Sequence, residues 1–164
     1  MGGASGEGSM NGQFGIYVLS ERLIDVLPYN YEDPVWRKLL NTPPSGEMII
    51  TDKDIEAYNW EDQEIILSSS SSDRLIGLEL IEKSFIVYLG KRPLFGGSFI
   101  ERGSARAINY PVIYIDKSRP HVVFQLWPIH GMFRSYRELK NATIKRRIEL
   151  ADVMHHFRTL GKLR

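Results

Sequence analysis

The pattern of hydrophobic and polar positions over residues 84–99 is the clearest structural signal in the chain. Phe85, Val87 and Leu89 alternate with Ile86 and Tyr88, which is the period of two that is typical of a β-strand. Residues 90–93, Gly-Lys-Arg-Pro, supply turn chemistry, and a second apolar run follows over residues 94–99. The stretch therefore predicts a β-hairpin that carries the core of a small mixed domain.

The same pattern of apolar positions predicts the other elements. Strands are expected over residues 14–19, 48–50, 63–67, 111–115 and 121–127. Helices or helical turns are expected over residues 21–27, 34–40, 52–58, 73–81 and 142–160. Asp33 before Pro34 is a helix cap, Thr51 and Asp54 form a capping box, and Gly161 ends the last helix. This order of elements predicts an α+β fold with a mostly antiparallel sheet, a central hairpin and a long C-terminal helix.

Length and composition limit the organisation of the chain. Its 164 residues, 43% hydrophobic and 25% charged, suit one soluble globular domain. Residues 1–12 are rich in Gly and Ser and are expected to be a flexible leader or a tag, which leaves residues 13–164 as the single domain. No apolar run approaches the roughly 20 residues of a membrane span. The absence of cysteine excludes disulfides, thiolate metal sites and cysteine nucleophiles.

Charge is distributed unevenly along the chain although the net charge is only +1. Residues 1–64 hold 12 acidic and 4 basic side chains, whereas residues 117–164 hold 11 basic and 3 acidic ones. Such asymmetry is found in proteins with an anionic partner, but it also results when the two ends pack near each other or simply solvate opposite faces of the molecule. We favour the second explanation.

Histidines and carboxylates are the candidate catalytic or metal-binding groups. The histidines are His121, His130, His155 and His156. Asp152 and His156 are four residues apart, so they share a helix face, but no third ligand is evident at an informative spacing. We therefore predict no metal, no cofactor and no catalytic residue. A small hydrolase that uses Asp52 or Asp54 with a histidine stays open as an alternative.

A basic cluster at residues 145–147 supports a second alternative, nucleic-acid binding through the C-terminal helix. Other basic and aromatic residues lie near it in the sequence: Phe133, Arg134, Tyr136, Arg137, Lys140 and Arg158. A solvated helix whose long side chains cover apolar surface explains the same pattern, and we prefer it.

Several motifs resemble an uncharacterised group of bacterial proteins. They are MIITDKDIEAYNW, QEIIL, FIVYLGKRPLFGGSF, PVIYI and a terminal GKL. In that group a strand leads into an I-T-x-x-D-I-x-x-Y-x-W helix, and a hairpin of the form F-V-V-x-x-x-G-x-x-I-Y-x-G-x-F follows. The resemblance implies a protein that follows a signal or lipoprotein segment, and therefore an extracytoplasmic location. It implies a fold more than a chemistry.

These observations together predict a non-catalytic binding or accessory module of a bacterial extracytoplasmic assembly, with an unidentified protein or small ligand as its partner. The expected contact surface is the hairpin and the segment after it, with Tyr88, Phe95, Arg102 and Arg106 as anchors. Aromatic and arginine side chains are enriched among the residues that dominate interfaces. Alanine at Phe95 or Arg102 is expected to weaken binding and to leave thermal stability nearly unchanged.

Overall fold

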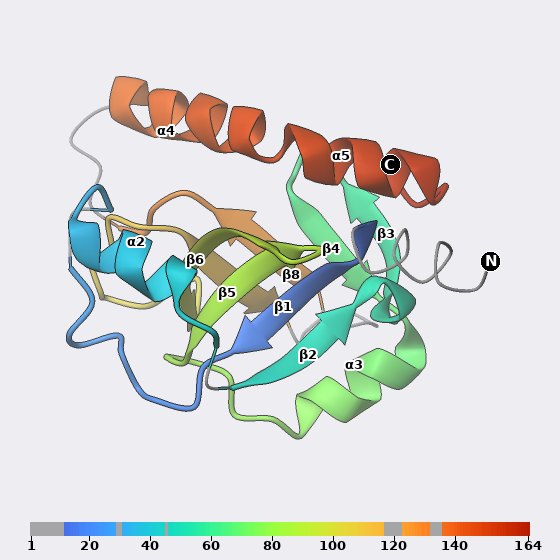
Figure 1. Ribbon diagram of the computed structural model, residues 1–164, viewed down its shortest axis with the longest axis horizontal. Coiled ribbons are helices and arrows are strands. Elements are labelled where there is room, and N and C mark those ends of the chain that lie inside the picture. Colours follow the sequence, from blue (N-terminus) through green and yellow to red (C-terminus); the bar gives the residue numbers. More distant parts are fainter. Residues whose placement is uncertain (1–11, 29–30, 45, 117–122, 132–135) are drawn as a thin grey trace.

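A computed structural model of the chain shows one eight-stranded sheet with the strand order β2-β1-β5-β6-β7-β8-β4-β3 (Figure 1). The structure describes residues 12–28, 31–44, 46–116, 123–131 and 136–164. The strands are β1 (Phe14–Val18), β2 (Glu47–Thr51), β3 (Ile55–Asn59), β4 (Glu64–Leu67), β5 (Ser84–Leu89), β6 (Arg92–Ile100), β7 (Val112–Asp116) and β8 (Val123–Trp127). The helices are α2 (Pro34–Asn41), α3 (Ser69–Ile76), α4 (Tyr136–Glu149) and α5 (Ala151–Thr159), with a 3₁₀ turn η1 (Asp52–Asp54).

The sheet is antiparallel except between β6 and β7, and it curls into a shape close to a barrel. Its two end strands, β2 and β3, follow one another in the chain and are joined by η1. The outer edge of β3 pairs with the C-terminal residues, because Tyr58 N–H donates to Lys162 O and Arg164 N–H donates to Tyr58 O, both at 2.8 Å. The predicted single α+β domain with a mostly antiparallel sheet is confirmed.

The hairpin formed by β5 and β6 is the centre of this sheet, as its pattern predicts. Gly90 turns the chain with a φ of 64°, which glycine adopts without a steric cost. A register shift between Val87 and Tyr88 marks a bulge in the hairpin. Farther along β6, an added Cβ at Gly97 would lie 1.8 Å from the carbonyl oxygen of Pro111, so only glycine fits there.

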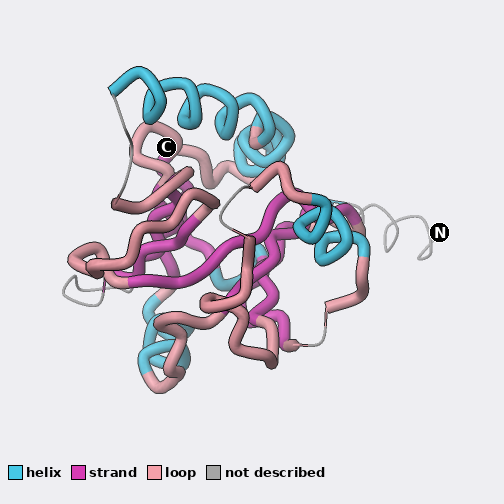
Figure 2. Tube along the Cα trace, turned by 90° about the vertical axis from the view of Figure 1, so that its left-hand side faces the viewer, coloured by secondary structure: helices cyan, strands magenta, loops and turns pink. Residues whose placement is uncertain are grey.

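The main core fills the concave side of the sheet. Phe14 packs edge-on against Phe157 of α5 at a centroid distance of 5.2 Å, and Phe157 also contacts Tyr58 at 5.0 Å. α4 and α5 lie over one end of the strands and α3 lies at the other, as Figures 1 and 2 show from two sides. On the outer face, Trp36 of α2 packs against Tyr110 at 4.8 Å and closes a second, smaller core.

The helix predicted over residues 52–58 is wrong beyond residue 54. The capping box is present, since Thr51 N–H donates to Asp54 Oδ2 at 2.8 Å. It nucleates only the short turn η1, because residues 55–59 form β3 and pair with β4 on one side and with the C-terminal residues on the other. Sheet hydrogen bonds to distant segments thus override a local helix signal.

Other helix limits also differ from the prediction. The residues 21–27 form only a hydrogen-bonded turn, in which Leu27 N–H donates to Leu23 O at 2.9 Å. The helix expected over residues 73–81 starts earlier and ends earlier, since α3 spans Ser69–Ile76 with Ser68 as its N-cap, so serines that precede the expected start lie inside the helix. The C-terminal helix starts earlier, at Tyr136, and is interrupted at Leu150, a fully buried residue. This interruption lets the buried face of α5 enter the core.

The oppositely charged ends of the chain contact each other, which is one of the two arrangements left open by the sequence. Lys145 Nζ lies 2.8 Å from Glu32 Oε1, and His156 Nε2 lies 2.9 Å from Asp52 Oδ1. Lys162 Nζ donates to the carbonyl oxygen of Asp52 at 2.6 Å. The charge asymmetry is therefore partly compensated within the molecule.

Candidate ligand-binding cleft

The four predicted anchor residues do not form one surface. Phe95 is 1% exposed and lies in the main core, and Tyr88, 9% exposed, lies in the cluster on the opposite face of the sheet. The role of Phe95 as a surface anchor is thus corrected, because its ring is enclosed and a partner cannot contact it. Arg102 and Arg106 both lie in the segment after the hairpin, where they have separate partners.

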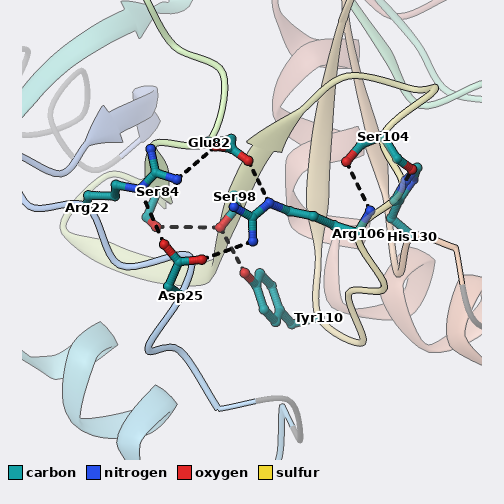
Figure 3. A network of polar contacts seen from close by, with 9 residues as sticks. All are labelled: Arg22, Asp25, Glu82, Ser84, Ser98, Ser104, Arg106, Tyr110 and His130. Atoms are coloured by element: carbon teal, nitrogen blue, oxygen red, sulfur yellow. Dashed lines mark hydrogen bonds and ion pairs between the residues drawn. The ribbon is translucent and has the colours of Figure 1, made fainter.

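Arg106 is the centre of a polar network that ties three segments together (Figure 3). Its Nε lies 2.6 Å from Glu82 and its Nη1 lies 3.0 Å from Asp25. Arg22 approaches the same two carboxylates, at 2.8 Å from Glu82 and 3.4 Å from Asp25. The four charges alternate around a closed ring, so each cation lies between two anions.

Electrostatics and backbone conformation indicate that this ring of four charged side chains has a structural role. The hydrogen bond from Arg106 is the main cause that holds the pKa values of Asp25 and Glu82 below their usual range. Glu82 has a φ of 70°, a left-handed conformation that is uncommon for a residue other than glycine. Its N–H donates to Phe99 O at 2.6 Å, which holds the backbone in place. The ring therefore fixes the segment around Arg106, and its charges neutralise each other.

His130 is also used structurally. Its Nε2–H donates to the carbonyl oxygen of Ser104 at 2.8 Å, so in the neutral imidazole Nδ1 is the acceptor for the hydroxyl of Tyr114, 2.6 Å away. Both residues are buried, and burial raises the pKa of Tyr114. The guanidinium of Arg102 covers the Tyr114 ring at 4.5 Å. Both ring nitrogens of His130 are thus occupied within the protein.

The acid and histidine pairs expected from the sequence are rearranged. Asp152 lies 2.7 Å from Arg92 rather than beside His156, which pairs with Asp52. Asp54 is held by Ser71 and Arg74; burial would raise its pKa, but these contacts and the Thr51 N–H lower it overall. His121, Phe133, Arg134 and the side chain of Tyr136 lie outside the described residues. Within the described part, no three metal-ligating side chains gather.

A cleft with different properties lies beneath α4. Its larger hollow, about 230 Å³, is enclosed by side chains from four separate segments: Tyr31, Glu32, Asn109, Tyr110, Pro111, Pro128, Ile129, Ala142, Lys145 and Arg146. α4 faces this hollow with part of its basic cluster, whereas Ile144 and Ile148 on its outer side are 48% and 71% exposed. Two isoleucines of α4 thus lie outward while Arg146 and Arg147 are half-buried, so the helix does not follow the usual arrangement with one apolar side facing inward. We call this site, with the adjoining hollow described below, the α4 cleft.

Arg146 is held in the cleft by aromatic rings. Its guanidinium lies 4.7 Å from the centroid of Phe95 and 5.4 Å from that of Tyr31. The hydroxyl of Tyr31 accepts a hydrogen bond from Gly96 N–H at 3.1 Å, which anchors this ring to β6. Phe95 thus supports the cleft from below, although it is not a contact residue.

A smaller hollow, about 70 Å³, lies next to the larger one and shares Pro128 and Arg146 with it as lining residues. It is lined by Glu61, Gln63, Leu126, Trp127, Pro128, Thr143, Arg146 and Arg147. Arg147 donates from Nη2 to the carbonyl oxygen of Glu61 at 2.7 Å. Its Nε is buried and has no hydrogen-bond partner among the described residues. A buried donor of this kind is costly unless water or a ligand satisfies it.

Other hollows are less suited to hold a specific ligand. One of about 320 Å³ lies between β1, β2 and residues 78–83, with mostly apolar walls and only Glu47 and Lys83 as charged groups. Another, of about 310 Å³, lies beside Arg106, whose charge is already paired. Specific sites combine an apolar pocket with a few convergent polar groups, and the α4 cleft fits this description best.

Comparison with known proteins adds no identification, because no family model, curated protein or solved structure matches the chain. The resemblance to a bacterial group thus stays a prediction. None of the helices that the structure describes has both the length and the apolar character of a membrane span.

Proposed function

We propose that this protein is a non-catalytic binding module and that it holds a ligand in the α4 cleft. The observation that carries the proposal is the orientation of α4, which directs Arg146 and Arg147 into hollows with aromatic walls while isoleucines remain exposed. Turning charged side chains inward is unfavourable for packing alone, and a residue arrangement of this kind is typical of binding sites.

The hydrolase alternative has less support. Asp52 and His156 are 2.9 Å apart, but Asp52 also accepts from Phe14 N–H at 3.3 Å, and the pair connects α5 to the start of η1. Neither residue lines the hollows described above. A general acid or base needs a substrate within hydrogen-bond reach, so the position of this pair favours a structural role.

Nucleic-acid binding and the cellular location remain separate predictions. Of the basic cluster, Lys145 pairs with Glu32 while Arg146 and Arg147 line the cleft, so the charges do not gather on one outer face. Retention on heparin that falls steeply with salt would support the nucleic-acid alternative. An accessory role in a bacterial extracytoplasmic assembly rests on the sequence resemblance, and fractionation of cells that express the native gene tests it.

The binding proposal is tested by NMR with a mixed set of small acidic, basic and neutral ring compounds. We expect amide shifts to concentrate at residues 109–110, at Ile129 and at residues 142–147, which surround the cleft. Ala142 lines the larger hollow, so Ala142→Phe fills it and should abolish these shifts. Asn141→Phe, at the exposed neighbouring position, should leave them unchanged. Shifts that gather in the hollow beside residues 78–83 instead, or that survive in Ala142→Phe, contradict the proposal.

A further inference from the structure

The two hollows of the α4 cleft share a wall made by Pro128 and Arg146. They differ in size, about 230 Å³ against about 70 Å³, and in lining. A ligand that spans both hollows must therefore carry two unlike parts, and each hollow specifies one of them.

The larger hollow is suited to a flat apolar group. Tyr31, Tyr110, Pro111 and Pro128 contribute rings to its walls. Tyr31 and Tyr110 both pack against Trp36, at 4.8 Å each, so their rings are held in place before a ligand enters. Fixed rings favour stacking on another planar ring, and this preorganisation lowers the entropic cost of binding.

The smaller hollow is suited to a small anion. Its volume equals about two water molecules, which is room for a carboxylate or a phosphate group but not for a ring. Two guanidinium groups and the single carboxylate of Glu61 line it, so the local charge is positive. The buried Nε of Arg147 supplies a donor without a protein partner among the described residues. Guanidinium groups bind planar carboxylates and phosphates through paired hydrogen bonds.

The remaining acidic group at the site does not oppose this assignment. Glu32, at the mouth of the larger hollow, is paired with Lys145 at 2.8 Å, and that contact is the main cause of its lowered pKa. Its charge is therefore compensated where a ligand would enter.

We infer that the ligand is a planar ring bearing a carboxylate or a phosphate, with the ring between Tyr31 and Tyr110 and the anionic group at Arg147. This inference rests on the proposed binding function and specifies the chemical class of ligand for the same cleft.

Matched small probes test the inference by NMR titration or calorimetry. Benzoate should bind about 10-fold more tightly than benzamide, because one charge-assisted hydrogen bond is worth about that factor. Benzoate should also bind more tightly than cyclohexanecarboxylate, whose ring is not planar, and than acetate, which has no ring. The affinity of phenyl phosphate is then compared with that of benzoate, and the tighter of the two shows whether the site prefers a phosphate or a carboxylate.

Variants locate the anionic group. Arg147→Gln should weaken benzoate about 10-fold and leave benzamide unchanged, whereas Arg137→Gln on the exposed side of the same helix removes the same charge and should change neither. Thr143 lines the smaller hollow, so Thr143→Leu fills it and should weaken benzoate and benzamide alike, which provides a second variant that locates the ring substituent if the first fails to fold.

The possible failures are distinguishable. Equal affinities for benzoate and benzamide, or an equal loss in Arg137→Gln and Arg147→Gln, overturn the inference while binding in the cleft still supports the proposed function. Equal affinities for benzoate and cyclohexanecarboxylate overturn the assignment of a planar ring. If none of these probes binds in the cleft, the inference is overturned, and the mixed compound set described above then decides whether the proposed function fails with it.

Discussion

Replacement of Phe95 by alanine separates the structural role of this residue from the surface role that its sequence position predicts. The ring is 1% exposed, packs edge-on against Phe85 at 6.1 Å and carries the guanidinium of Arg146 at 4.7 Å. Truncation of a buried phenylalanine costs about 3–5 kcal/mol because it removes burial and leaves a cavity. Loss of the cation–π contact adds about 0.5–1 kcal/mol. We therefore expect the free energy of unfolding to fall by about 3.5–6 kcal/mol.

Urea denaturation followed by circular dichroism measures this change. The midpoint should fall with little change of slope, and the melting temperature should fall by roughly 7–24 °C for a domain of this size. Val26→Ala is the control, since Val26 is 71% exposed and its truncation should stay within about 0.5 kcal/mol. A loss below about 1 kcal/mol in Phe95→Ala would show that the ring is not enclosed and would refute the packing described here.

Three further changes test other parts of the structure. Gly97→Ala places a Cβ 1.8 Å from a backbone carbonyl oxygen of the neighbouring segment, so we expect the unfolding free energy to fall by an amount near the upper end of about 1–3 kcal/mol. Gly103→Ala is the control, because an added Cβ there has no neighbouring atom within 4 Å, and it should change the unfolding free energy by less than about 0.5 kcal/mol. Tyr114→Phe leaves a nitrogen of His130 without its donor and should cost about 1–3 kcal/mol in urea denaturation; an unchanged midpoint would mean that water replaces the hydroxyl. Arg106 lowers the pKa values of its two carboxylate partners, so their stabilising effect is present at neutral pH and is lost as the pH falls below their ordinary values of 4.5 and 3.8. Arg106→Gln should therefore flatten the loss of stability below those values, and equal acid sensitivity in both proteins would argue against the ion-pair ring.

Local patterns predicted the parts of the fold that local forces determine. The hairpin of β5 and β6 follows from period-two alternation and a glycine turn, and α2 follows from a cap and a proline, since Asp33 accepts from Val35 N–H at 2.9 Å. The strand β3 could not be predicted in this way, because its state depends on pairing with β4 and with residues 162–164. The sequence of residues 55–59 alone does not indicate these pairing partners.

The candidate site was only partly visible in the sequence. Lys145, Arg146 and Arg147 form a conspicuous basic run, but the inward orientation of the two arginines depends on how α4 lies on the sheet. The aromatic walls come from Tyr31 and Tyr110, which are distant in sequence and meet only in the folded chain. The single local signal for these residues is the proline that follows Tyr110 directly, and it indicates the start of a strand rather than a ligand site.

A crystal of the protein soaked with 4-bromobenzoate gives the most direct test of ligand binding in the α4 cleft. We expect an anomalous bromine peak in the larger hollow, between the rings of Tyr31 and Tyr110, with carboxylate density beside Arg147. A bromine peak beside residues 78–83, or no peak in the cleft at a soak concentration well above the affinity measured in solution, would contradict the central claim.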